Sequence, residues 1–482
     1  MTGYMLFSIK KEEWLGNIRN DLFAGLVSSI ALLPEVVGFA IIAGVNPMTA
    51  LFASATTILV ISFTGGRPAM VSAAAGSMAL VMASLIKSHG LEYMIAATIL
   101  TGLLQLILGY LGIQKLMKFI PKTVMFGFVN ALAILIFLAQ IQQLPGQTLW
   151  TYFMVALTII LMYALPKIIK SVPPALIVIL IMTVVAMIFP EYLQKIGDMG
   201  NMSTVVPILS FPTVPFTIET LVIIFPTAIA LTMVGLIESL LTIPLVDKMT
   251  ETKGDSKREV KSQGLANIVT GLFGGPAGCA MIGQAVINVK SGGRKRLSTF
   301  IAGIALLVLI FGLKDMMVQI PTAALIGIMI TVSFETFEWE SLSLIRSFQI
   351  TESMIMLVTI SLVVYTHNLA IGIFVGVLLS SVIFMAKLAN ISITQEENVF
   401  VVRGPLFFAS THEFLHYFES RDYDNETLII NLSDSHILDH SGIEALKTLI
   451  INTKKQNRKI VIIGLEIHNP ELRNEMDLLL SE

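Results

Sequence analysis

GLFGGPAGCAMIGQAVINVK, residues 271–290, interrupts an apolar run at membrane depth with Gly274, Gly275, Pro276 and Gly278. A helix broken inside a bilayer leaves N–H and C=O groups without partners, so a break survives only where protein buries it or where it lines a watery cavity. The short helical run that follows would direct the positive end of its dipole at that place, which suits an anion. We interpret the segment as half of a transporter's binding site.

The composition is that of a polytopic membrane protein. Of the 482 residues, 55% are hydrophobic and 13% are charged, and the mean hydropathy is +0.81, outside the range of soluble globular domains. The single cysteine, Cys279, excludes a disulfide framework and a multi-cysteine metal site. We expect no cofactor, no metal and no nucleic-acid partner. The N-terminal region lacks a small-residue cleavage site, so we expect its first span to be an uncleaved anchor.

Apolar runs long enough to cross a bilayer, about 17 to 25 residues, recur along the chain. They lie at 21–43, 48–64, 92–112, 121–141, 148–165, 172–190, 218–245, 297–313, 318–334, 350–366 and 369–386, with shorter or interrupted runs at 70–86, 262–274 and 278–290. Together they predict fourteen spans. Lys and Arg concentrate in cytoplasmic loops, and with the N-terminus inside, the outside loops hold only Lys87, Lys195 and Lys314. We therefore predict that both termini are cytoplasmic.

Dividing fourteen spans into two sevens puts the interrupted segments in matching places. The third span, 68–86, and the tenth, 276–290, each begin with proline, continue through small residues and are short. Such matched segments indicate a midplane site between inverted repeats. The alternative interpretation is that the small residues only permit close helix packing.

After Lys387 the composition changes to that of a small soluble domain. Strands are predicted within 398–409, 427–433 and 459–465, and helices at 443–456 and around 471–482. Alternating strands and helices imply an α/β layer. We divide the chain into a transmembrane region, 1–390, and a C-terminal domain, 391–482.

Three distant motifs carry a family resemblance. RNDLFAGLVSSIALLPEVVGFAIIAGVNP (19–47), GCAMIGQAVINVKSGGRKRLS (278–298) and GPLFFAS (404–410) with LIINLSDSHILDHSGIEAL (428–446) together resemble a bacterial SulP inorganic anion permease with a cytoplasmic STAS domain. The resemblance implies seven-plus-seven inverted repeats with a core and a gate domain. It also implies a homodimer in the bacterial inner membrane, with the anion between the facing ends of the third and tenth spans.

Two carboxylates lie within predicted spans. Glu238, in the eighth span, is flanked by apolar residues, and an ionisable group there costs a few kcal/mol. The resemblance gives its position a role in ion coupling, and a carboxyl there can bind and release a proton during transport. Thr242, one turn on, matches a hydroxyl that lines the site. Glu35 follows Pro34, which bends the first span, and is a second coupling candidate. The alternative for Glu238 is a structural carboxylate bonded to helix ends.

Backbone N–H groups at the two half-helix starts are the expected donors to the anion. They belong to Ala73, Ala74, Ala75, Gly76 and Ser77 in the third span, and to Ala280, Met281, Ile282 and Gly283 in the tenth. The Ser77 hydroxyl and the Gln284 amide can add to them. Bicarbonate-transporting members have threonines in these helices, where this chain has alanine, methionine or isoleucine. We take Cys279 as a small apolar residue.

In the C-terminal domain, Asp439-His440-Ser441-Gly442 resembles the loop whose first serine is phosphorylated in anti-sigma-factor antagonists. His440 occupies that position, so phosphorylation there is lost. We expect the domain to serve dimer contact, a cytoplasmic protein partner or gate regulation. A cluster of loop histidines there lacks metal-ligand spacing, namely His412, His416, His436 and His440.

Several functions are compatible with these features. The favoured one is secondary active transport of an inorganic anion, sulfate first, by proton symport and alternating access. Alternatives are proton- or sodium-coupled transport of bicarbonate or a dicarboxylate, a nucleobase permease, and a membrane-anchored STAS signalling protein. An anchor needs neither Glu238 nor two broken helices. The soluble part shows no nucleophile-base pair, so we expect no enzyme activity.

Overall fold

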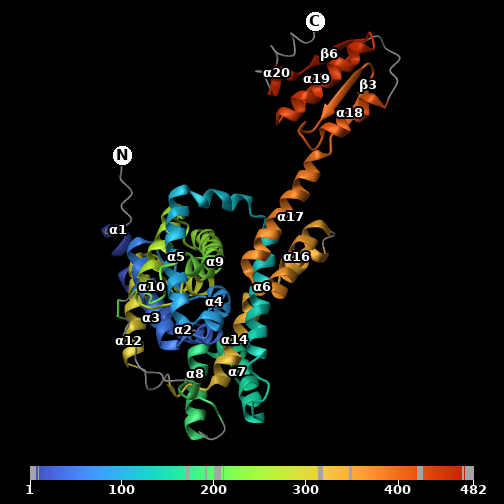
Figure 1. The fold of residues 1–482 in the computed structure, drawn as a ribbon. Helices are drawn as coiled ribbons and strands as arrows, with labels where there is room; N and C mark the ends of the chain where they lie inside the picture. The colour runs from blue at the N-terminus through green and yellow to red at the C-terminus, as the bar shows by residue number, and fades with distance from the viewer. Residues whose placement is uncertain are drawn as a thin grey trace. The chain divides into compact units, whose positions relative to one another are not determined.

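A computed structural model describes residues 7–8, 10–169, 173–189, 193–199, 208–209, 211–312, 318–346, 350–420, 427–468 and 472. The chain divides into two compact units, Met1–Val377 and Leu378–Glu482, and the division falls inside one long helix. The first unit is helical, and the second is a small sheet with helices (Figure 1). The domain boundary at 390/391 stays a prediction.

Helices dominate the first unit. Among the described residues, seven are long and apolar enough to cross a membrane: α2 (Ile18–Ala43), α3 (Pro47–Thr64), α5 (Leu91–Leu111), α6 (Lys122–Ile141), α7 (Leu149–Ile168), α9 (Ile218–Thr250) and α17 (Leu369–Ala389). Shorter apolar helices are α8 (Pro174–Ile188), α12 (Arg296–Gly312), α14 (Thr322–Thr336) and α16 (Ile350–Thr366). The remaining elements are α1 (Lys11–Trp14), α4 (Gly76–His89), η1 (Ile113–Phe119), η2 (Ile196–Met199), α10 (Ser256–Leu272), α11 (Ile282–Lys290) and α15 (Ser341–Arg346). The count of fourteen spans stays a prediction.

Local sequence sets several helix ends. Asn46 accepts a hydrogen bond from the Met48 N–H at 2.8 Å, and Pro47 occupies the first turn of α3. Asp255 caps α10 in the same way through the Arg258 N–H. Gly44, with φ +74°, ends α2 in the left-handed conformation. The start at Asp255 lengthens the interrupted run predicted at 262–274 by a polar first turn.

Polar side chains lie inside the helical unit, and apolar ones lie on its outside. Gln105, Gln263 and Asn267 are fully buried, whereas Leu149 and Ile188 are 86% and 63% exposed. Asn267 donates to the Gln105 amide oxygen at 2.8 Å, linking α10 to α5. This arrangement suits a lipid solvent, because polar groups that face hydrocarbon have no partner.

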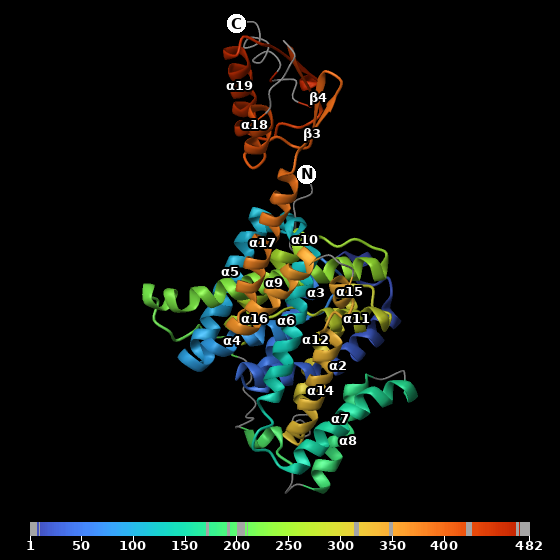
Figure 2. The same cartoon turned by 90° about the vertical axis from the view of Figure 1, so that its right-hand side faces the viewer.

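Helix contacts exchange between the two halves of the chain. α12 packs on α2 and α3, and α5 packs on α9 and α10. In the same manner α16 packs on α6, and α7 packs on α14; Figure 2 shows the α7–α8 pair side by side at one end. If the second seven predicted spans repeat the first seven, each of these contacts maps onto its partner. The packing therefore supports an inverted repeat.

The α5–α10 contact depends on two glycines. A Cβ on Gly102 would lie 2.5 Å from the Gly264 carbonyl oxygen, and a Cβ on Gly264 would lie 2.7 Å from the Gly102 carbonyl oxygen. Backbone cannot move aside as a flexible side chain can. Small residues at such crossings let helices approach closely in the absence of a hydrophobic driving force.

The second unit has a four-stranded sheet in the order β3-β4-β5-β6, formed by β3 (Ser392–Glu396), β4 (Val399–Arg403), β5 (Thr427–Asp434) and β6 (Lys459–Ile463). β3 is antiparallel to β4, and the other pairs are parallel. The helices are α18 (Thr411–Glu419), α19 (His440–Lys455) and α20 (Leu465–His468). The three predicted strands and the helix within 443–456 are confirmed. β3 and α18 were missed, and the predicted helix around 471–482 lies almost wholly outside the described residues.

Candidate anion-binding site

Two short strands precede the two short helices at the centre of the first unit. β1 (Ser72–Ala73) pairs antiparallel with β2 (Cys279–Ala280), in the register Ser72 with Ala280 and Ala73 with Cys279. α4 begins only at Gly76, and α11 only at Ile282. The sequence-based placement of Ala73–Ala75 and Ala280–Met281 in helix starts is therefore wrong. Extended pairing prevailed because it satisfies the backbone groups that each break exposes.

Internal hydrogen bonds occupy several of the predicted backbone donors. The Ala74 N–H donates to Ser54 Oγ at 3.2 Å, and the Ala280 N–H donates to Ser239 Oγ at 3.1 Å. The Met281 N–H donates to the Val71 carbonyl at 2.9 Å. These three groups are not available to an anion, which corrects the prediction for them.

The open donors lie one step further along each helix. By helix geometry, the first turn of α4 and the first turn of α11 leave N–H groups without intrahelical acceptors. They belong to Gly76, Ser77, Met78, Ile282, Gly283 and Gln284. The predicted Gly76, Ser77, Ile282 and Gly283 are thus among the open donors, and sequence reasoning did not place Met78 there.

The two helix starts differ in access. Gly283 is exposed, and no atom lies within 4 Å of the position that its Cβ would occupy. Gly76 is buried, and its Cβ would lie 2.5 Å from the ring of Phe39, a residue of α2. Open space therefore reaches the start of α11, while an aromatic ring covers the start of α4.

Glu238 connects both breaks. It lies on α9 with 8% of its surface exposed, and its Oε2 accepts hydrogen bonds from Ser77 Oγ and from Cys279 Sγ, the latter at 3.1 Å. One carboxylate thus contacts the first turn of α4 and strand β2. Cys279 is therefore a hydrogen-bond donor as well as a small residue, which its sequence context did not reveal.

The other predicted residues lie around this centre. Thr242 is buried, and its hydroxyl donates to the Glu238 carbonyl of its own helix at 2.7 Å, so that donor is engaged within α9. Glu35 is half-buried on α2 and faces Gln284 of α11 and Glu335 of α14. The Gln284 amide is fully buried and makes no hydrogen bond of normal geometry within the described part of the chain.

A cavity of about 650 Å³ lies between α2, α4 and α9 on one side and α6 with the α16–α17 connection on the other. Its only charged or titratable lining residues are Lys87 and His367; the others include Ile42, Leu80, Val81, Ser84, Gln142, Thr227 and Asn368. A lining with cationic and no acidic side chains favours anions over cations.

Comparison with known proteins assigns the fold and the family. The profile of the sulfate permease family matches residues 18–154 and 148–359, and the STAS domain profile matches residues 390–474. The chain belongs to the sulfate permease family. This permease is a multi-pass membrane transporter of anions rather than an enzyme, as its family and relatives are.

Relatives of the permease span nearly its full length. A candidate sulfate transporter of Bacillus subtilis, YbaR, is 48% identical over 97% of this chain and 98% of its own. The bicarbonate transporter BicA of Picosynechococcus is 28% identical over 80% of this chain and 73% of its own.

Solved structures share the architecture. The transmembrane domain of a cyanobacterial BicA superposes with a TM-score of 0.69 at 26% identity, covering 76% of the permease and 99% of that domain. Murine Slc26a9 in its inward-facing state superposes with a TM-score of 0.82 at 17% identity, covering 97% and 88%. The second likeness shows the fold alone. Within the described ranges, no group of three or more His, Cys, Asp or Glu side chains is placed to hold a metal ion.

Proposed function

We propose that this permease is a proton-coupled sulfate symporter of the bacterial inner membrane. In this proposal the anion binds between the starts of α4 and α11, and alternating access comes from a core that moves against a gate. Both termini are cytoplasmic, because that orientation leaves only Lys87, Lys195 and Lys314 in outside loops. The functional division is a permease region, 1–390, and a STAS domain, 391–482, that contacts a second subunit or a cytoplasmic protein.

The observation that carries the proposal is the open space at the start of α11. Gly283 exposes backbone N–H donors there, and beside it the buried Gln284 amide lacks a partner. Neither helix start carries a lysine or arginine, so binding depends on N–H groups and helix dipoles. An anion held in this way is bound moderately, and a carrier must also release its cargo.

Glu238 supports proton coupling through its position. Its carboxylate contacts Ser77, whose N–H is one of the proposed anion donors. A negative charge so close opposes anion binding in a site of low dielectric, and a proton on the carboxyl removes that repulsion. Binding of the proton and of the anion would therefore favour each other, which is what symport requires. Glu35 is a second candidate, because it faces Gln284 at the open helix start.

Bicarbonate is the second candidate cargo, since the solved BicA domain is 26% identical over its whole length. Sulfate stays first because the 48% identical relative carries that description. A sodium-coupled mechanism and dicarboxylate cargo remain arms of the test.

The test is uptake by purified permease in proteoliposomes, with labelled sulfate, bicarbonate and a dicarboxylate under imposed H⁺ or Na⁺ gradients. We expect an inward proton gradient to accelerate sulfate uptake and Glu238→Gln to abolish that acceleration. Glu219→Gln, an exposed acid on the first turn of α9, is the matched control and should keep the acceleration. Full gradient dependence in Glu238→Gln would refute the coupling role. Faster bicarbonate than sulfate uptake would overturn the assigned cargo.

A further inference from the structure

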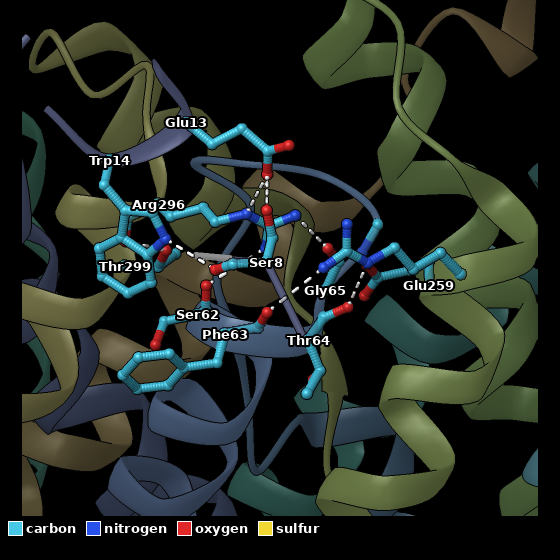
Figure 3. Close-up of polar contacts among 12 residues, drawn as sticks. Ser8, Glu13, Trp14, Ser62, Phe63, Thr64, Gly65, Glu259, Arg296 and Thr299 are labelled. Carbon is cyan, nitrogen blue, oxygen red and sulfur yellow. Dashed lines mark hydrogen bonds and ion pairs between the residues drawn. The ribbon is translucent and has the colours of Figure 1, made fainter. Parts of the chain in front are cut away.

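The N-terminal segment is fastened to the ends of two membrane helices (Figure 3). The Ser8 N–H donates to the Phe63 carbonyl at the end of α3 at 2.9 Å, and Trp14 Nε1 donates to the Ser8 carbonyl at 2.9 Å. The Trp14 ring packs on the rings of Phe63 and Phe300. Residues 8 to 14 therefore form a defined turn against α3 and α12.

An ion pair strengthens this attachment. Glu13 Oε2 accepts from Arg296 Nε at 2.5 Å and from Ser8 Oγ at 2.8 Å. Arg296, 2% exposed at the start of α12, also donates to the Gly65 carbonyl at 2.6 Å. Burial raises the pKa of Glu13, and the Arg296 and Ser8 contacts reverse that effect, so its net pKa is below the usual value. Glu13 thus stays ionised and paired at neutral pH.

What the segment leaves exposed is apolar and cationic. Leu15, Ile18 and Phe23 are 47%, 48% and 55% exposed, on the turn that leads from α1 into α2. Exposed cations border them, namely Lys10, Lys11 and Arg19, and within the described residues these three make no hydrogen bond or ion pair.

Acidic groups near the segment do not cancel these cations. Glu13 is paired with Arg296, and Asp21 is buried and accepts the backbone N–H groups of Arg294 and Lys295 at 2.7 and 3.2 Å. Glu12 is the remaining exposed acid of α1. Lys295 adds a further cation, because its side chain reaches to within 2.9 Å of the Cβ position at Gly16.

We propose that residues 7–23 form an anionic-phospholipid site at the membrane surface. In this site Lys10, Lys11 and Arg19 bind the headgroup phosphates, and the exposed apolar side chains enter the acyl boundary. The occupant follows from charge complementarity and from continuity with α2, which crosses the membrane. Arg296 positions the site by holding Glu13. The proposal does not depend on which anion is transported.

The test uses Trp14 as a reporter in the full-length protein. Trp150→Phe with Trp339→Phe leaves Trp14 as the remaining one of three tryptophans. We expect dibrominated phosphatidylglycerol in mixed micelles to quench Trp14 at lower mole fraction than dibrominated phosphatidylcholine. Adding Lys10→Gln, Lys11→Gln and Arg19→Gln should weaken the apparent affinity for phosphatidylglycerol on the order of tenfold.

Controls separate charge at this site from total charge and from misfolding. Lys454→Gln, Lys455→Gln and Arg458→Gln remove the same charge from the second unit and should keep the lipid preference, and Lys10→Arg with Lys11→Arg should keep it too. Equal quenching by both lipids in the reporter protein, or an unchanged preference in a correctly folded triple variant, would overturn the proposal. Displacement by soluble glycerol phosphate would assign the site to free phosphate instead. Transport is not measured, so these outcomes are separate from the proposed function.

Discussion

At the scale of single residues, buried polar groups have specific partners. Glu238 accepts from Ser77 and Cys279, and Arg296 donates to Glu13 and to two backbone carbonyls. A charge taken out of water is costly unless it is paired, so removal of one partner affects more than one hydrogen bond. Each residue of these clusters can therefore be tested by removing its partner.

Glu13→Gln should lower the thermal stability of the permease at neutral pH. The variant leaves the buried Arg296 without its counter-ion, and we expect a loss of about 1–2 kcal/mol for a pair that is partly exposed. Because the folded-state pKa of Glu13 is lowered, this contribution is present above the unfolded value of 4.5 and is lost as pH falls through the folded pKa.

The measurement is the difference in melting temperature between parent and Glu13→Gln across pH 7 and acidic conditions in detergent. The difference should shrink once the pH is below the ordinary glutamate value. Glu12→Gln, an exposed neighbour with no resolved shift in its titration, should leave the melting temperature unchanged. A difference that persists unchanged into acid would show that the Glu13 charge does not stabilise the fold.

At the scale of elements, two breaks that look alike in sequence become one paired unit. β1 and β2 satisfy each other's backbone groups, so each helix can begin inside the protein. The proline and small residues at 68–86 and 276–290 indicated the breaks. They did not indicate which N–H groups stay open, because that depends on the pairing register and on serines from other helices, Ser54 and Ser239.

Gly283→Ala should weaken sulfate uptake without loss of stability. The added methyl group meets no atom within 4 Å, so the fold accepts it, yet it stands beside the proposed anion donors. We expect KM to rise several-fold while the melting temperature stays within about 0.5 kcal/mol of the parent in stability terms.

Gly264→Ala is the contrasting variant for this prediction. Its methyl group would lie 2.7 Å from the Gly102 carbonyl, so it should destabilise the α5–α10 contact and reduce folded yield. Uptake kinetics and thermal unfolding of both variants measure the two effects separately. An unchanged KM in a fully folded Gly283→Ala protein would argue against an anion at the start of α11.

At the scale of the whole molecule, two units have different solvents. The helical unit places polar side chains inside and apolar ones outside, whereas the C-terminal unit buries Phe414, Ile430 and Leu446 around its sheet. Lysine and arginine distribution gives the proposed orientation, with the STAS domain in the cytoplasm.

Cysteine labelling tests this orientation. The native Cys279 is fully buried, so the parent protein should not react with a membrane-impermeant maleimide. In intact spheroplasts, Ser88→Cys should react, because the connection after α4 is placed outside. Ser420→Cys, exposed in the C-terminal unit, should react only after permeabilisation. The opposite labelling pattern would invert the proposed topology.

The sequence by itself determined the membrane class, the two interrupted segments and the intramembrane carboxylates, because composition, hydropathy and glycine-proline placement are local properties. Its motifs also pointed to the family. Only the tertiary structure decided that Ala74, Ala280 and Met281 use their N–H groups internally and that Glu238 contacts Ser77, 161 positions away, and Cys279, 41 positions away. Contacts between distant segments follow from how the helices pack, and no local pattern of residue types specifies that packing.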